Sequence, residues 1–193
     1  MELEVSGAQE VMRDKTWNLA IDYIEKNKTT STSEAVSNGV WTEILRRNFP
    51  FPKFIIAPEQ RQTTRKRPDL TIFFVDNVNS EWHPVFTFEG KAPYHIDKNS
   101  KIQDGIAQAA GYVPSLSWSN HQEKHKDEKA THGMFACGKS FMILKYDVKS
   151  KEISRIVPHK QEVTSNDLTT ASSLVTDAKN FDDFCKRIAD SFH

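Results

Sequence analysis

The sequence predicts an α/β (α+β) protein in which helices flank a mixed central β-sheet. Long segments carry apolar residues at the spacing of an amphipathic helix, and short runs rich in β-branched and aromatic residues lie between them. The two kinds of segment follow one another in the order α, α, β, β, β, α, β, β, α. Strands and helices that mix along one chain are typical of helices packed against a sheet.

Two helices are expected before the first strand. Residues 8–26 carry apolar side chains at roughly helical spacing, namely Val11, Leu19, Ala20, Tyr23 and Ile24. The polar stretch 27–33 is rich in residues that cap helix N-termini, and a second helix follows at about 33–48. The apolar arc of that helix is formed by Val36, Val40, Trp41, Ile44 and Leu45.

Strand-like runs occupy the middle of the chain. The clearest two are 67–75 and 84–92, and they follow a run at 51–58 that has proline near both ends. An amphipathic stripe then predicts a third helix at 99–116. The remaining expected elements are a hairpin around Gly138 within 133–147, a short strand at 151–158 and a C-terminal helix at 181–192.

Composition favours one domain that covers residues 1–193. A chain of this length with 37% hydrophobic and 27% charged residues can bury one core. We expect that core at about 31–158, with the N-terminal helix 8–26 and the C-terminal helix 181–192 packed on it.

Charge and cysteine content narrow the class further. Lys plus Arg and Asp plus Glu number 26 each, so only a local basic patch, and not the net charge, can indicate nucleic acid. The two cysteines make neither a disulfide framework nor a metal quartet and suit a reducing compartment. The sequence has no apolar run long enough for a membrane span and no apolar signal core. We therefore expect an intracellular protein of the cytoplasm or nucleus, without a membrane partner.

The most informative residues lie at the ends of two consecutive predicted strands. Asp69 follows Pro68 at the start of one strand, and Glu89, Gly90 and Lys91 end the next. Side chains alternate faces along a strand, so Glu89 and Lys91 point the same way, while Gly90 allows another backbone to approach. If the strands are neighbours, Asp69 lies beside Glu89, and two carboxylates with a lysine form a site for a hard cation.

These elements and residues resemble the PD-(D/E)xK nuclease superfamily over about residues 31–147. That family has a core of α-β-β-β-α-β, with an acid on the second core strand and a (D/E)xK sequence on the third. Asp69 and Glu89-x-Lys91 occupy those places. Gln108 and Tyr112, on the next predicted helix, match the QxxxY element of RecB-type nucleases. The resemblance thus implies a restriction-endonuclease-like fold.

The resemblance also implies a chemistry, namely Mg²⁺-dependent (or Mn²⁺-dependent) hydrolysis of phosphodiester bonds that leaves 5′-phosphate ends. Asp69, Glu89 and the carbonyl of Gly90 would hold one or two metal ions. Lys91 would position the attacking water or stabilise the charge that builds on the phosphate. Gln108 and Tyr112 would orient Lys91 or contact the phosphate.

A further carboxylate is expected from the helix at 33–48, as the family often adds one there. Glu34 falls within the apolar arc of that helix, and Glu43 lies just outside it beside Arg47. We therefore favour Glu34 as a metal ligand. A structural reading stays open, because Ser31-x-x-Glu34 is also a capping box.

A basic run precedes the first acid. Arg61, Arg65, Lys66 and Arg67 crowd the approach to Asp69. Beside a phosphodiester site they would bind substrate phosphates, whereas the alternatives are a solvated turn or a short nuclear-import signal.

Other interpretations remain open for each residue. Asp69 can be a turn residue, Glu89 and Lys91 an edge ion pair, and Gln108 and Tyr112 ordinary surface residues. The rival classes are an inactive nuclease-like module that binds nucleic acid or a protein, and a structural or small-molecule domain. Expected partners are nucleic acid, with DNA favoured over RNA, and a homodimer is left open.

Overall fold

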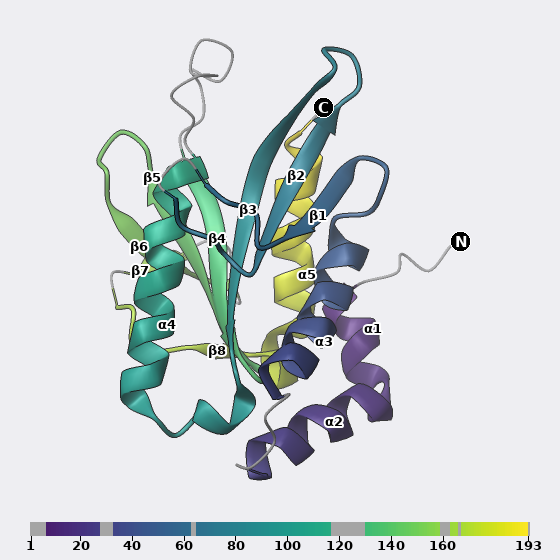
Figure 1. Ribbon diagram of the computed structural model, residues 1–193, viewed down its shortest axis with the longest axis vertical. Coiled ribbons are helices and arrows are strands. Elements are labelled where there is room, and N and C mark those ends of the chain that lie inside the picture. Colours follow the sequence, from purple (N-terminus) through teal and green to yellow (C-terminus); the bar gives the residue numbers. More distant parts are fainter. Residues whose placement is uncertain are drawn as a thin grey trace.

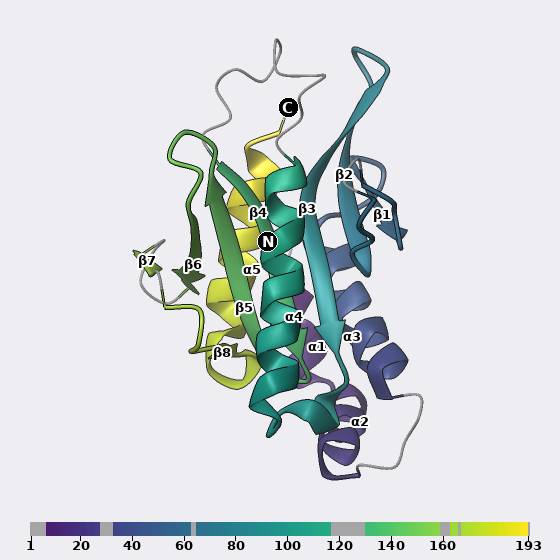
Figure 2. The same cartoon turned by 60° about the vertical axis from the view of Figure 1, so that its left-hand side comes forward.

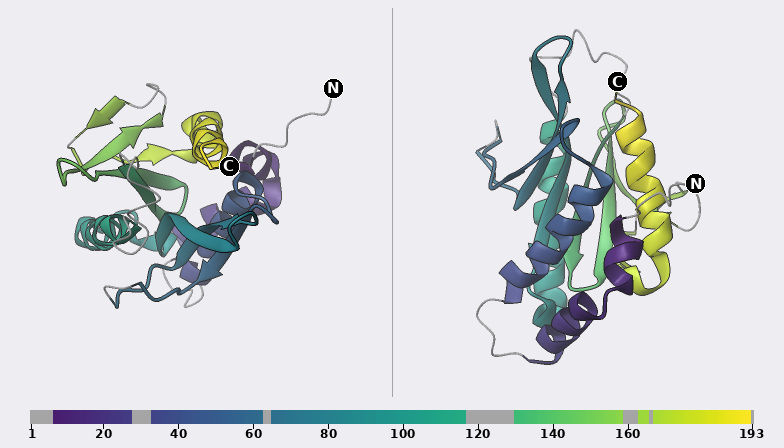
Figure 3. Two further views of the ribbon diagram at one scale, coloured as in Figure 1. Left: turned by 90° about the horizontal axis from the view of Figure 1, so that it is seen from above. Right: turned by 90° about the vertical axis from the view of Figure 1, so that its right-hand side faces the viewer.

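A strongly twisted mixed sheet forms the middle layer of the computed structural model, with helices on both faces (Figure 1). The structure describes residues 7–27, 33–62, 65–116, 130–158, 163–165 and 167–192. Helix α4 covers one face of the sheet, and α1, α3 and α5 cover the other (Figure 3). The predicted fold class, a mixed sheet flanked by helices, is confirmed.

The bounds of the elements follow the chain. The helices are α1 (Gly7–Arg13), α2 (Lys15–Lys26), α3 (Ser33–Asn48), α4 (Asn99–Tyr112) and α5 (Leu174–Asp190), with 3-10 turns at Pro93–His95 and Val113–Leu116. The strands are β1 (Phe54–Pro58), β2 (Leu70–Asp76), β3 (Glu81–Lys91), β4 (Ala130–Cys137), β5 (Ser140–Asp147), β6 (Ile153–Val157), β7 (Val163–Ser165) and β8 (Ser172–Ser173). Within the described ranges, no helix has the length and apolar character needed to cross a membrane.

Strands β1 to β7 lie in the sheet in the same order as in the sequence, and β8 pairs with β5. The pairing of β3 with β4 is parallel, and the other pairs are antiparallel. A parallel pair needs a crossover connection, and α4 provides it by running back across the sheet between β3 and β4 (Figure 2).

The alternation of side chains along β3 separates an apolar face from a face that carries polar side chains at the end of the strand. Phe86 and Phe88 point to the α3 side and join the larger hydrophobic core. Lys91 reaches the α4 side, where a Cβ built on Gly105 of that helix would lie 3.0 Å from its Cγ. The polar end of β3 is therefore directed toward α4, while its phenylalanines hold the strand in place.

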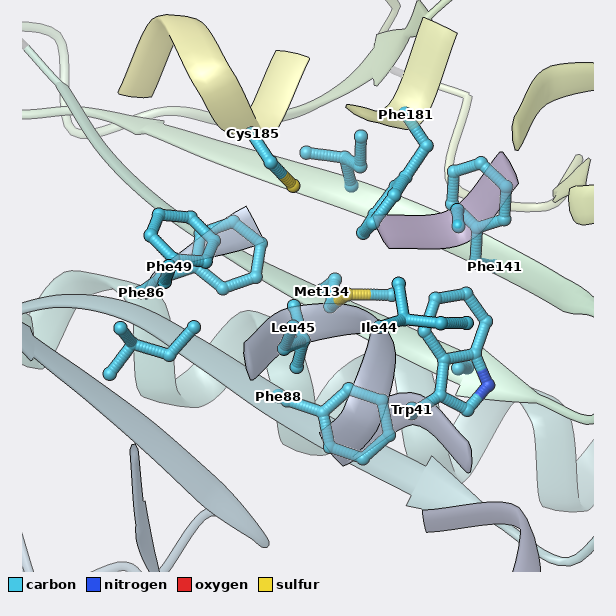
Figure 4. Close-up of a cluster of buried hydrophobic side chains, with 14 of the residues drawn as sticks. Trp41, Ile44, Leu45, Phe49, Phe86, Phe88, Met134, Phe141, Phe181 and Cys185 are labelled. Carbon is cyan, nitrogen blue, oxygen red and sulfur yellow. The ribbon is translucent and has the colours of Figure 1, made fainter. Parts of the chain in front are cut away.

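Trp41 is fully buried in the core between α3, α5 and the sheet (Figure 4). Its ring lies 6.0, 5.9 and 5.7 Å from those of Phe88, Phe141 and Phe181, and its indole nitrogen donates a hydrogen bond to the Gly138 carbonyl. One buried tryptophan thus joins helices α3 and α5 to strands β3 and β5, and packs against the strand that carries Glu89.

Several predicted boundaries are wrong, each for a local reason. The segment 8–26 forms two helices, because Asp14 caps α2 by accepting a hydrogen bond from the Thr16 amide. The C-terminal helix begins at Leu174, well before 181, because Ser173 caps it. Three side chains expected in apolar helix stripes are exposed instead, namely Leu19 and Tyr23 of α2 at 66% and 61% and Val36 of α3 at 38%.

The N-terminal helix is attached to the rest of the protein through a buried carboxylate. Asp182 of α5 accepts hydrogen bonds from the amides of Ala8 and Gln9 at the start of α1, at 2.6 and 2.9 Å, and from Asn48 Nδ2 of α3 at 2.9 Å. Its side chain therefore supplies partners for helix N–H groups that have none within α1.

We expect Asp182→Ala to lower the free energy of unfolding by about 2–3 kcal/mol, because it leaves buried donors without partners. The matched control is Asp183→Ala at the next position. Asp183 pairs on the same helix with Lys179 in a half-exposed ion pair, so the control should cost no more than about 0.5 kcal/mol. Urea denaturation of both variants measures the difference, and equal costs would contradict the capping role.

Candidate active site at the end of strand β3

Asp69 and Glu89 lie opposite each other on adjacent strands. Leu70 pairs with Phe88 in the antiparallel β2–β3 ladder, so Asp69 and Glu89 are the next pair toward the end of β3. The Asp69 carboxylate accepts a 2.8 Å hydrogen bond from the Gly90 amide. The predicted proximity of these two acids is observed, and main-chain geometry fixes it.

Glu89 is a buried carboxylate with a cationic partner. The residue is 4% exposed, and its Oε1 accepts a 2.6 Å hydrogen bond from the Lys91 ammonium, which comes from the same face of β3. Burial above all, together with the charges of Asp69 and Glu34, raises the pKa of Glu89 to about 7, although the hydrogen bond and charge of Lys91 lower it. The lysine thus compensates only part of the cost of burying this acid.

Tyr112 approaches the same carboxylate from the last turn of α4. Its side chain is buried, and its hydroxyl is hydrogen-bonded to Glu89. Burial, the negative charges of Glu89 and Asp69, and this hydrogen bond raise the pKa of Tyr112 to about 12, so the hydroxyl stays protonated and can donate. Gln108, one turn earlier on α4, is exposed. Among the described contacts, Gln108 makes none with Asp69, Glu89 or Lys91.

Helix α3 contributes from the opposite side. The charge of Glu34 affects the pKa of Glu89, which places it near the site. Glu43 instead forms ion pairs with Arg46 and Arg47 at 2.9 and 2.7 Å. Glu43 is thus held by arginines and Glu34 stays a predicted ligand, while Ser31 of the alternative capping box lies outside the described residues.

Asn38 is a site residue that the sequence analysis missed. Its Nδ2 donates a 3.2 Å hydrogen bond to Asp69, so α3 helps to orient that carboxylate. The side chain also explains Gly90, because a Cβ at that position would lie 1.9 Å from Asn38 Oδ1. The close approach expected at Gly90 is thus made by a side chain, not by backbone. The sequence carries only a weak signal for it, the four-residue spacing from Glu34 that puts both side chains on one helix face, because its partner Asp69 is 31 residues away.

The donor groups at the site fit a hard cation by their chemistry. Asp69, Glu89 and Glu34 offer carboxylate oxygens, the ligands that Mg²⁺ and Mn²⁺ prefer. Asn38 Oδ1 is a buried oxygen for which the described residues provide no hydrogen-bond donor. Among the residues that the structure describes, no three or more His, Cys, Asp or Glu side chains are grouped closely enough to bind a metal ion.

The basic run lies beside the end of α4. Arg61, Arg65, Lys66 and Arg67 are all exposed, and Lys66 Nζ lies 3.4 Å from the Gly111 carbonyl in the last turn of that helix. This run comes immediately before Pro68 and Asp69 in the chain. Among the described contacts, none of the four cations of this run forms an ion pair with Asp69 or Glu89.

Comparisons with known proteins give no relative. The chain matches no protein-family model, and neither a curated protein nor a solved structure is significantly similar to it.

The raised pKa of Glu89 predicts a specific dependence of stability on pH. A folded-state pKa above the ordinary value of 4.5 means that the folded chain binds the proton more tightly than the unfolded chain. Stability should therefore fall as pH rises from about 4.5 to about 7, by up to about 3 kcal/mol from this group, and then level off. Glu89→Gln should remove that component from urea-denaturation free energies measured across the range.

Glu43→Gln is the control with the opposite sign. Hydrogen bonds from Arg46 and Arg47 lower the pKa of Glu43, so the native carboxylate adds stability that is lost as the pH falls. If Glu89→Gln and the native chain show the same pH dependence, Glu89 is not buried as described.

Proposed function

We propose that the chain is a metal-dependent nuclease, a hydrolase that cleaves phosphodiester bonds of nucleic acid, DNA in preference to RNA, and leaves 5′-phosphate ends. The observation that supports this most strongly is the joining of Asp69, Glu89 and Lys91 at the paired ends of β2 and β3. Burial and the neighbouring acids both disfavour the charged form of Glu89 and raise its pKa. Such perturbed acids are typical of functional sites.

The order of elements supports the proposal at the level of the fold. Helix α3, strands β1, β2 and β3, helix α4 and strand β4 follow one another in the order α-β-β-β-α-β. This is the order of the PD-(D/E)xK core that the sequence resembles. We propose that this part of the sheet with α3 and α4 is a restriction-endonuclease-like core.

Each polar group has a defined part in the proposed reaction. Asp69, Glu89 and the Gly90 carbonyl would hold Mg²⁺ or Mn²⁺, with Glu34 assisting from α3, and the ion would supply an acidified water and positive charge against the phosphate. Lys91 orients that water or stabilises the charge of the transition state. Tyr112 fixes the Glu89 carboxylate through its hydroxyl, and Asn38 with the Gly90 amide fixes Asp69.

One observation favours a second candidate, an inactive module that binds nucleic acid or a protein partner. The 2.6 Å pair of Glu89 and Lys91 satisfies both charges without a ligand. In the nuclease, the cation would take over the Glu89 oxygen and free the Lys91 ammonium for substrate. In the inactive module the pair would persist, and the two candidates therefore differ in whether a divalent ion activates cleavage.

The carboxylates should be essential for cleavage. We expect Asp69→Asn and Glu89→Gln to abolish Mg²⁺-dependent cleavage of plasmid and single-stranded DNA without loss of the fold, because each removes a charged ligand and keeps its shape. Lys91→Ala should lower the single-turnover rate by several orders of magnitude with nearly unchanged substrate binding.

Glu43→Gln serves as the matched control and should keep full activity, because the Glu43 carboxylate is paired with Arg46 and Arg47 away from the site. Circular dichroism checks that every variant is folded. Full activity in Asp69→Asn or Glu89→Gln would rule out the metal-site assignment, and no cleavage by the native chain with Mg²⁺ or Mn²⁺ would favour the inactive module.

The basic run should act through phosphate contacts. Replacing Arg61, Arg65, Lys66 and Arg67 by glutamine should weaken DNA binding and reduce its salt dependence, by roughly 0.9 in the log–log slope for each phosphate contact on duplex DNA. Fluorescence anisotropy at several salt concentrations measures both effects. Lys149→Gln with Lys151→Gln, exposed at the β5–β6 turn, is the control, and the same slope in all proteins would identify the run as a solvated turn.

A further inference from the structure

A cavity of about 220 Å³ opens beside the carboxylates on the α4 side of the sheet. It lies between β2, β3 and the 3-10 turn that follows α4. The residues that bear on its chemistry are Arg61, Gln62, Thr71, Phe73, Trp82 and Leu116. Pockets for drug-sized ligands measure about 300–1,000 Å³, so this one suits a single ring system.

Aromatic rings form one wall of the cavity. The rings of Phe73 and Trp82 lie 5.2 Å apart on adjacent strands, and Trp82 is 58% exposed. Phe73 is buried in the sheet, with 8% of its surface exposed, and its ring packs against the indole of Trp82. An exposed indole supported by a buried ring is a surface on which a flat molecule can stack.

Two polar atoms at the cavity have no hydrogen-bond partner among the described residues. Thr71 is 2% exposed, and its Oγ1 has no hydrogen bond within the described part of the chain. The same holds for Gln62 Oε1. The Gln62 amide is oriented by its Nε2, which lies 3.4 Å from the Tyr112 carbonyl, so the oxygen is the atom left over. Buried polar atoms without partners are costly, and these two would be satisfied by a ligand that brings an N–H donor.

The cavity lies two residues along strands β2 and β3 from the proposed catalytic carboxylates. Thr71 pairs with Thr87, and Asp69 and Glu89 each lie two residues from that pair. Two residues along a strand span about 7 Å. This short distance means that a nucleotide whose phosphate lies at the carboxylates can place its base in the cavity.

We propose that this cavity binds one unpaired nucleobase that bears an exocyclic amino group, from the strand that is cleaved at Asp69 and Glu89. This inference rests on the proposed nuclease function. The base stacks on Trp82, its amino group donates to Gln62 Oε1, and Arg61 at the rim contacts an adjacent phosphate. A base in a duplex is covered on both faces by its neighbours, so the substrate is single-stranded or locally unpaired.

Binding without cleavage tests the inference. Fluorescein-labelled homopolymers of deoxyadenylate, deoxycytidylate and thymidylate, and a duplex of mixed sequence, are titrated with the protein in EDTA. The native chain should bind the adenine and cytosine strands more tightly than the thymine strand, because an exocyclic amino group projects from the ring of adenine and of cytosine, whereas the N3–H of thymine lies between two carbonyl oxygens that would repel Gln62 Oε1. Trp82→Ala should weaken binding of the single strands about tenfold or more, the loss expected for one stacked base.

Two further variants separate stacking from recognition. Gln62→Leu should abolish the preference for adenine and cytosine over thymine while it leaves the thymine affinity nearly unchanged. Trp17→Ala removes another tryptophan at the surface, on α2, and should change nothing. Thermal melting shows whether each variant is folded, and Trp82, being largely exposed, can be replaced without opening the core.

The outcomes distinguish this inference from the proposed function. Equal affinities of native and Trp82→Ala proteins for all strands, or no binding of any oligonucleotide, would overturn the base site. If cleavage with Mg²⁺ persists in that case, the nuclease proposal stands without it. Trp82-dependent and Gln62-dependent binding with no cleavage in Mg²⁺ or Mn²⁺ would instead support the base site and reject the nuclease.

Discussion

The burial of the Glu89 carboxylate is the constraint on which the other features of the site depend. Strand β3 is covered by α3 on one face and α4 on the other, so a side chain near its end is removed from water. An ionised carboxylate in such a place is costly unless it is paired and hydrogen-bonded. Lys91 and Tyr112 provide that pairing, and both are aimed at the same residue from different elements. A well-packed apolar side chain at this position would stabilise the fold as well as the acid does. The presence of an acid is therefore an argument for a functional role.

The Asp69 carboxylate is held by a main-chain group of β3 and by a side chain of α3. The Gly90 amide and Asn38 Nδ2 both donate to the Asp69 carboxylate, at 2.8 and 3.2 Å. Gly90 is needed twice, because its N–H binds Asp69 and its missing Cβ leaves room for Asn38. The position of Asp69 therefore depends on the distance between α3 and β3. Trp41 sets that distance by packing its ring on Phe88, so the core and the site share one strand and one helix.

The sequence allowed the strand pair and its acids to be predicted because local rules are strong there. Runs rich in β-branched and aromatic residues defined β2 and β3, and the two-residue period placed Glu89 and Lys91 on one face. Asn38 and Gln62 were missed, because their importance comes from contacts with residues distant in the sequence. The break at Asp14 was missed for a different reason, since one capping side chain outweighs a continuous apolar pattern. The QxxxY pattern gave a mixed result, because Tyr112 faces Glu89 while Gln108 is exposed.

The last turn of α4 connects the proposed cleavage site to the proposed base site. The Tyr112 hydroxyl is hydrogen-bonded to Glu89, and its carbonyl accepts from Gln62 at the cavity. The neighbouring Gly111 carbonyl accepts from Lys66 of the basic run. Both contacts from the 61–67 segment are long, at 3.4 Å, and therefore weak. They join an exposed, cationic segment to the helix turn that orients the buried acid.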